Sequence, residues 1–408
     1  MDKRKYTTTA AGVCARKTPA APGPLFLTNA PLMQPLSAED FLDRMQQLIL
    51  GTSMNSTYKL ALLMSVTDAA LAFAPTGLNE ETCRIPLSRV ALEFLRIYWP
   101  QRLPFSSGLP GVAPARLSQG INRRAGAKSS DAVFTIIDEA LEEAHRLHPE
   151  AGIVTFEQFS RCGGLLQKAA RRCTALLKKN PLKYIAPEAD FLFEQKGDAL
   201  ELAAFSVHLL QRFRPIINEL VESRWVAHLR GIESNDSILG QAPGASLRDF
   251  LFNPVRGDTL AGIRRALVEI TGARCFYCGK KIARHDALHV DHFLPFTRYA
   301  HTRLFNFVLA CPSCNASKSN WLAGARHVEH WVERNADYAA PILEASADFA
   351  PAGGLEVANM ALSLYGLAAG HAEPLWLERS KPRQALYENI LPALQENRTT
   401  MLALGASA

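Results

Sequence analysis

One stretch of the chain has an unusual density of metal-binding side chains. It spans residues 274–320 and reads RCFYCGKKIARHDALHVDHFLPFTRYAHTRLFNFVLACPSCNASKSN. Two C-x-x-C pairs, Cys275/Cys278 and Cys311/Cys314, contain half of the chain's 8 cysteines. Each short knuckle aims two sulfurs at one point, so two knuckles suit a tetrahedral zinc ion. The sequence therefore predicts a structural Zn²⁺ bound by these four cysteines.

The segment between the two pairs carries polar side chains of another kind. Residues 288–295 (LHVDHFLP) alternate like a short strand, with His289 and Asp291 on one face and His292 on the other. Pro295 ends this run. Three further polar residues are notable after it: Asn306 before the second cysteine pair, and Asn315 and Lys318 after it. This pattern predicts the order strand, loop, strand, knuckle and short helix.

The stretch resembles the HNH endonuclease family, the ββα-metal nucleases, in its four-cysteine zinc-ribbon form. The resemblance rests on D-H-x-x-P at 291–295, on Asn306 before a hydrophobic run, and on C-x-x-C-N-x-x-K at 311–318. Several residue types agree in order and spacing, which makes the match specific although it covers only about sixty residues. A non-catalytic zinc finger remains the alternative.

The resemblance implies a role for each polar residue. His292 would be the general base, and Asp291 and Asn315 would bind one divalent cation, Mg²⁺ or Mn²⁺. Asn306 would orient His292 or its loop, and His289 is expected to support the site. The third of the three residues that give the family its name is an asparagine here, Asn315, and not a histidine. This asparagine keeps an oxygen ligand suited to a hard cation.

These residue types also fit phosphodiester hydrolysis on chemical grounds. A phosphodiester anion repels hydroxide, so hydrolysis needs a cation to neutralise charge and a base that titrates near pH 7. Histidine is such a base. Neighbours in a strand point to opposite faces, so Asp291 and His292 reach one phosphate only where the strand end is bent or the phosphate lies at its edge, which the Pro295 break favours.

The composition is that of an ordinary globular protein. The 408 residues are 48% hydrophobic and 21% charged, with a net charge of +6, which permits a nucleic-acid partner without requiring one. No run of eighteen apolar residues occurs, so we expect a soluble, cytoplasmic protein without a membrane partner. The other cysteines, at positions 14, 83, 162 and 173, are expected to be reduced thiols.

The expected fold class is α+β, a predominantly α-helical body with a small zinc-bound ββα-metal HNH nuclease domain. We expect an irregular arm at 1–36, a helical substrate-selection or regulatory domain at 37–250, the nuclease domain at 251–335 and a helical extension at 336–408. The boundary is placed in a segment, 232–257, that reads as loop-rich. Predicted elements are helices at 38–50, 56–73, 87–99, 130–147, 164–180, 205–231 (kinked or split at Pro215), 258–272, 323–335, 355–367 and 382–390, and a hairpin at 191–202.

Basic residues outside the motif give candidate contacts with DNA phosphates. Lys168, Arg171 and Arg172 lie on one side of the predicted helix 164–180, and Arg123 and Arg124 lie in a stretch without acidic residues. Lys318 could contact a phosphate as well. In each case a solvated surface is the alternative.

The leading hypothesis is a metal-dependent endonuclease that cuts DNA, double-stranded in our expectation. Analogy favours restriction or anti-phage defence, with a regulatory protein partner or an oligomer as further options. The second hypothesis is a zinc-ribbon protein that binds nucleic acid without cutting it. A protein-interaction adaptor is third, because an adaptor does not explain the Asp, His and Asn residues at these spacings.

Overall fold

The computed structural model is mainly helical with two small sheets, which confirms the α+β expectation. It describes residues 36–51, 54–72, 82–121, 132–240, 244–252, 257–282, 287–299, 301–346 and 353–404. The predicted arm, apart from Leu36, lies outside these ranges, as do Arg123 and Arg124. Within the described ranges, no helix has both the length and the apolar character that a membrane crossing requires.

The N-terminal part is a set of helices around one hydrophobic core, whose buried residues run from Phe41 to Leu251. Helix α1 begins after Ser37, whose hydroxyl caps the helix by accepting a hydrogen bond from the Asp40 backbone N–H at 3.0 Å. The helices of this part are α1 (Ala38–Leu50), α2 (Tyr58–Ala72), α3 (Leu87–Tyr98), α4 (Ala132–Leu147), α5 (Phe156–Phe159), α6 (Gly163–Leu177), α7 (Lys183–Ile185), α8 (Ala204–Arg230), α9 (Asp236–Leu239) and α10 (Gly244–Phe252).

A three-stranded antiparallel sheet joins this core, in the order β1-β3-β2. Strands β2 (Glu194–Lys196) and β3 (Ala199–Ala203) form the predicted hairpin, although β2 starts later than expected. Strand β1 (Thr82–Pro86) was not predicted, because it contains only two buried positions in alternation.

Three sequence predictions for the helices are corrected by the structure. Helix α8 continues as one helix through Pro215, so it is not split there. The segment 232–257 contains α9 and α10, so it is not loop-rich. No helix covers 382–389; instead α16 begins at Ile390, where residues buried at intervals of three and four (Ile390, Leu394, Asn397 and Met401) define one helix face.

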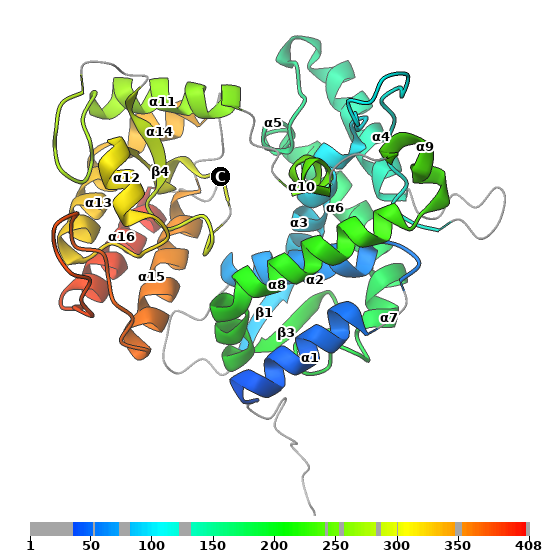
Figure 1. The fold of residues 1–408 in the computed structure, drawn as a ribbon, viewed down its shortest axis with the longest axis horizontal. Helices are drawn as coiled ribbons and strands as arrows, with labels where there is room; N and C mark the ends of the chain where they lie inside the picture. Colours follow the sequence, from blue (N-terminus) through cyan, green and yellow to red (C-terminus); the bar gives the residue numbers. More distant parts are fainter. Residues whose placement is uncertain are drawn as a thin grey trace, which may run out of the picture. The chain divides into compact units, whose positions relative to one another are not determined.

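The C-terminal part has its own hydrophobic core, whose buried residues run from Ile263 to Met401. Its elements are α11 (Gly257–Thr271), β4 (His289–His292), β5 (Phe307–Ala310), α12 (Pro312–Lys318), α13 (Ala325–Asp337), α14 (Ala339–Ala345), α15 (Gly354–Gly370) and α16 (Ile390–Ala403). Helix α16 packs against both α13 and α15 (Figure 1).

The centre of the C-terminal part has the strand, strand, helix order that the sequence predicts. Strands β4 and β5 pair antiparallel, with Asp291 opposite Val308 and His292 opposite Phe307. All four residues of β5 are buried, so this strand anchors the hairpin in the core. Helix α12 follows β5 directly and lies next to β4 (Figure 1).

Candidate active site and metal centre

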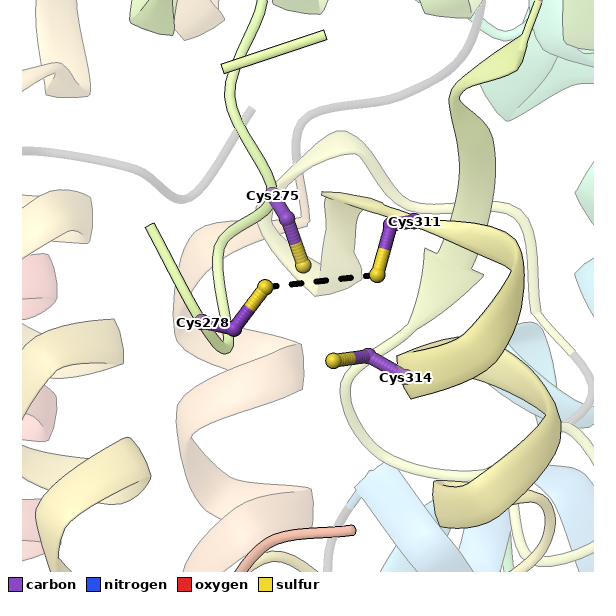
Figure 2. A group of neighbouring side chains, drawn as sticks. All are labelled: Cys275, Cys278, Cys311 and Cys314. Atoms are coloured by element: carbon purple, nitrogen blue, oxygen red, sulfur yellow. Dashed lines mark hydrogen bonds between the residues drawn. The ribbon is translucent and has the colours of Figure 1, made fainter. Parts of the chain in front are cut away.

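The four cysteines of the two knuckles come together in space. Figure 2 shows their side chains pointing toward a common centre. All four sulfurs lie within 4.8 Å of one another, and the Sγ atoms of Cys278 and Cys311 are 4.0 Å apart. Tetrahedral zinc with Zn–S bonds of about 2.3 Å requires sulfurs about 3.8 Å apart. The predicted four-cysteine cluster is therefore present, and its dimensions suit zinc.

Backbone hydrogen bonds explain how the chain forms the two knuckles. The Gly279 N–H donates to the Cys275 carbonyl at 2.8 Å, and Gly279 has the positive φ of 69° that this tight turn requires. The Phe276 N–H donates to the Leu309 carbonyl at 2.7 Å and thereby joins the first knuckle to β5. In the second knuckle Cys311 is the N-cap of α12, which places Cys314 in the first helical turn.

Burial and neighbouring hydrogen-bond donors act in opposite directions on the pKa values of the thiols. Burial raises the pKa of Cys275 and of Cys314. Burial acts in the same direction on Cys311, but the Ser313 hydroxyl and the Cys314 backbone N–H outweigh it and lower the pKa of Cys311 to about 6. Four thiolates this close repel one another, so all four become charged together only around a cation.

One face of β4 lies against α12. Nδ1 of His289 is 3.1 Å from Nδ2 of Asn315, and Oδ2 of Asp291 is 3.2 Å from Nζ of Lys318. His289 and Asp291 are two residues apart on a strand, and Asn315 and Lys318 are three apart on a helix, so each pair shares a face. Asp291 and Asn315, the two predicted cation ligands, therefore lie on facing surfaces.

The His292 ring lies on the other face of β4. Its centroid is 4.5 Å from that of Phe307, its cross-strand partner, and 5.2 Å from that of Phe296, whose side chain is 42% exposed. Burial, together with the positive charge of Lys318, lowers the pKa of His292 to about 4. The imidazole is therefore neutral at pH 7 and has a lone pair that can accept a proton.

Asn306 is fully buried and holds the chain just after β4. Its Oδ1 accepts a hydrogen bond from the Leu294 N–H at 2.8 Å, and its Nδ2 donates to the Leu294 carbonyl at 3.1 Å. The Phe293 N–H donates to the Asn306 carbonyl at 2.8 Å. A single asparagine thus fixes the two residues that follow His292.

Two residues at the site have positions that the sequence did not indicate. Lys318 is fully buried, whereas both sequence interpretations, a phosphate contact and a solvated lysine, place its ammonium at the surface. The Tyr277 hydroxyl donates to Asp291 Oδ2 at 2.6 Å. The only available signal for Tyr277 was its location, an aromatic residue with a polar tip inside the first knuckle.

The basic residues of α6 are partly engaged by acidic residues of α4. Nζ of Lys168 lies 2.6 Å from Glu143, and Arg172 forms an ion pair with Glu139. Arg171 is exposed. A DNA phosphate would therefore have to displace two carboxylates to contact Lys168 and Arg172.

A second group of potential metal ligands, Asp68, Glu93 and His301, is buried in the described structure. The two carboxylates of this group already form ion pairs with arginine side chains. Asp68 pairs with Arg96 at 2.8 Å and with Arg214 at 2.7 Å, and Glu93 pairs with Arg96 at 2.7 Å and with Arg89 at 2.7 Å. These positive charges oppose a cation, so this group is an ion-pair network and not a metal site.

Comparison with known protein families gives two matches. Residues 38–242, half of the chain, match a family described as a domain of unknown function, DUF8808. Residues 275–320 match the family described as HNH endonuclease. The second match covers both cysteine knuckles, β4, β5 and α12. No curated protein and no solved structure matches the chain.

Proposed function

Because the chain belongs to the DUF8808 family and carries an HNH endonuclease domain, we propose that it is a metal-dependent endonuclease that hydrolyses phosphodiester bonds of DNA. The observation that supports this best is the arrangement of β4 and α12. Two oxygen-bearing side chains, Asp291 and Asn315, lie on facing surfaces, and oxygen donors are the ligands that Mg²⁺ and Mn²⁺ prefer.

The two metal sites have different roles in this proposal. Cys275, Cys278, Cys311 and Cys314 would hold Zn²⁺, and four sulfur ligands leave no position for water, so this site is structural. Asp291 and Asn315 would hold Mg²⁺ or Mn²⁺. When bound there, the divalent cation neutralises charge that develops on the scissile phosphate.

His292 acts as the general base, which requires the scissile phosphate to lie at the edge of β4, because the His292 ring and the Asp291 carboxylate are on opposite faces of this strand. Its neutral imidazole takes a proton from the water molecule that attacks phosphorus. Its pKa of about 4 is low for a base at neutral pH; the negative charge of a bound phosphate acts to raise that pKa, and a bound divalent cation acts to lower it. Asn306 fixes the backbone of residues 293 and 294, which limits how far the His292 end of β4 moves.

Cleavage of a supercoiled plasmid in the presence of Mg²⁺ or Mn²⁺ tests the proposal. The wild-type protein should produce nicked or linear DNA, and His292→Ala should lose about 10²- to 10⁴-fold in rate, the usual contribution of a general base. His148→Ala, which changes an exposed histidine of the helical part, should retain full activity. Equal rates in wild type and His292→Ala would remove His292 from the mechanism.

The same assay distinguishes the second hypothesis, a zinc protein that binds nucleic acid without cutting it. Retarded DNA on a gel, with no strand break under any divalent cation, would establish binding without catalysis. Double-stranded DNA as substrate, substrate selection by the helical N-terminal part, and a setting in restriction or anti-phage defence belong to our proposal. They rest on the combination of an HNH domain with a large companion domain.

A further inference from the structure

Two buried side chains hold the carboxylate of Asp291, and the roles assigned above use neither. The Tyr277 hydroxyl donates to Oδ2 of Asp291 at 2.6 Å, and Nζ of Lys318 lies 3.2 Å from the same oxygen. Tyr277 is 6% exposed, Asp291 9% and Lys318 0%. Hydrogen bonds to a charged group are strong in such surroundings because water does not compete for the donors.

Tyr277 belongs to the first zinc knuckle, between Cys275 and Cys278. Its ring makes edge-on contacts with His327 and Trp376, at centroid distances of 5.3 Å and 5.1 Å. A phenol hydroxyl donates to a carboxylate oxygen, so Tyr277 is the donor in its 2.6 Å contact with Asp291. The knuckle thus presents a fixed donor to Asp291.

Lys318 reaches Asp291 from α12, one helical turn beyond Asn315. Its ammonium also donates to the His292 carbonyl at 2.9 Å. A buried ammonium is unfavourable unless it is paired and hydrogen-bonded, and these two contacts supply both conditions. Lys318 therefore connects the two β4 residues to which the proposed function assigns a role, Asp291 and His292.

We propose that Tyr277 and Lys318 are positioning residues that occupy Oδ2 of Asp291, so that Asp291 binds the divalent cation through Oδ1 alone. This inference rests on the proposed function, because it requires a cation at Asp291. A carboxylate with one oxygen fixed by two donors enters the site already oriented. The uncharged Tyr277 hydroxyl strengthens cation binding in this way, whereas the Lys318 ammonium orients the same oxygen but also repels the cation. The zinc knuckle thereby affects the catalytic site through Tyr277.

The variant Tyr277→Phe tests this, because it removes the hydroxyl and keeps the ring. Mn²⁺ binding to the full-length, zinc-loaded protein is measured by electron paramagnetic resonance of free Mn²⁺, and plasmid cleavage is measured over the same Mn²⁺ range. We expect the Kd for Mn²⁺ and the concentration for half-maximal cleavage to rise about tenfold, which corresponds to about 1.4 kcal/mol. Cleavage at saturating Mn²⁺ should return close to the wild-type rate, with zinc content unchanged.

Tyr184→Phe is the matched control, because Tyr184 is 64% exposed and lies outside the nuclease domain. It should leave Mn²⁺ binding unchanged. An unaltered Mn²⁺ Kd in Tyr277→Phe would overturn the inference. Loss of zinc from Tyr277→Phe would overturn it as well, since the hydroxyl would then serve the knuckle and not Asp291.

Asp291→Ala separates this inference from the proposed function. If the wild-type protein binds Mn²⁺ in an Asp291-dependent way but cuts no DNA, the nuclease proposal fails, and weaker binding by Tyr277→Phe still supports the positioning role. If Asp291→Ala binds Mn²⁺ as tightly as wild type, there is no cation for Tyr277 to position, and the inference fails.

Discussion

Nδ1 of His289 lies 3.1 Å from Nδ2 of Asn315, so the imidazole nearest to this proposed cation ligand is that of His289. The amide nitrogen of Asn315 is the donor in this contact and the ring nitrogen is the acceptor. Because the amide nitrogen faces the ring, the amide oxygen points in a different direction, in which it can accept a cation. His289 therefore fixes which atom of Asn315 faces the proposed cation site.

We predict that His289→Ala reduces plasmid cleavage by about tenfold, the effect of losing one hydrogen bond of about 1 to 1.5 kcal/mol. His289→Gln should recover part of this loss, because its side-chain oxygen can accept the same hydrogen bond from Asn315. His292→Ala should be at least ten times more damaging than His289→Ala. The reverse order would make His289 the general base in place of His292.

Sequence alone predicted the parts of the site that depend on local geometry. A C-x-x-C knuckle brings two sulfurs together by itself, so the zinc cluster followed from spacing. The alternation of residues 289–292 likewise assigned His289 and Asp291 to one face of the strand, and the contacts of β4 with α12 agree with that assignment. Here the local pattern was sufficient.

Other features depend on contacts between distant segments, which spacing does not reveal. A lysine near the end of a short helix is usually solvated, and only the packing of α12 on β4 shows that Lys318 is buried beside Asp291. The basic face of α6 was visible in the sequence, but its pairing with Glu139 and Glu143 of α4 was not. Charge periodicity identifies a face and does not identify what covers it.

Lys318→Met should destabilise the nuclease domain strongly. Removing one member of a buried ion pair leaves the other charge uncompensated, which costs about 3 to 5 kcal/mol. Urea unfolding of zinc-loaded protein checks this, and added Mn²⁺ should restore part of the loss because a cation at Asp291 replaces the missing charge. Lys168→Met, which breaks an exposed pair with Glu143, should leave the stability nearly unchanged, because solvent screens such a pair.

Zinc removal should abolish cleavage even when Mg²⁺ is in excess. Structural zinc contributes about 10 to 16 kcal/mol of apparent binding energy, so Cys311→Ser should lose the zinc and the fold around β4 and α12. Metal analysis should give one zinc per wild-type chain and less in Cys311→Ser. Cys162→Ser, which changes a cysteine outside the cluster, should keep its zinc. Full activity of a zinc-free protein would contradict the structural role.

His301 offers a prediction about pH that is independent of the proposed activity. It is 2% exposed, and its Nε2 lies 3.8 Å from Oδ1 of Asp68 in α2. Two carboxylates act on it, those of Asp68 in α2 and Glu93 in α3. Four arginines also act on it: Arg89 and Arg96 of α3, Arg214 of α8, and Arg303 of its own loop. Burial lowers the pKa of His301 well below its usual value, and the four arginines lower it further, so together they outweigh the attraction of Asp68.

The protein should therefore lose stability as the pH falls below about 6.5, where His301 of the unfolded chain takes up a proton that the folded chain does not. A histidine whose pKa is lower in the folded protein than in the unfolded chain contributes its full stability at pH values above the pKa of the unfolded chain. Between pH 7 and pH 5.5 the free energy of unfolding should fall by about 1 kcal/mol more in wild type than in His301→Asn. Other histidines with lowered pKa values, such as His208 and His228, contribute equally to both proteins and cancel in this difference. Equal pH dependence in wild type and His301→Asn would mean that His301 takes up its proton in the folded protein, and hence that Asp68 outweighs burial and the four arginines.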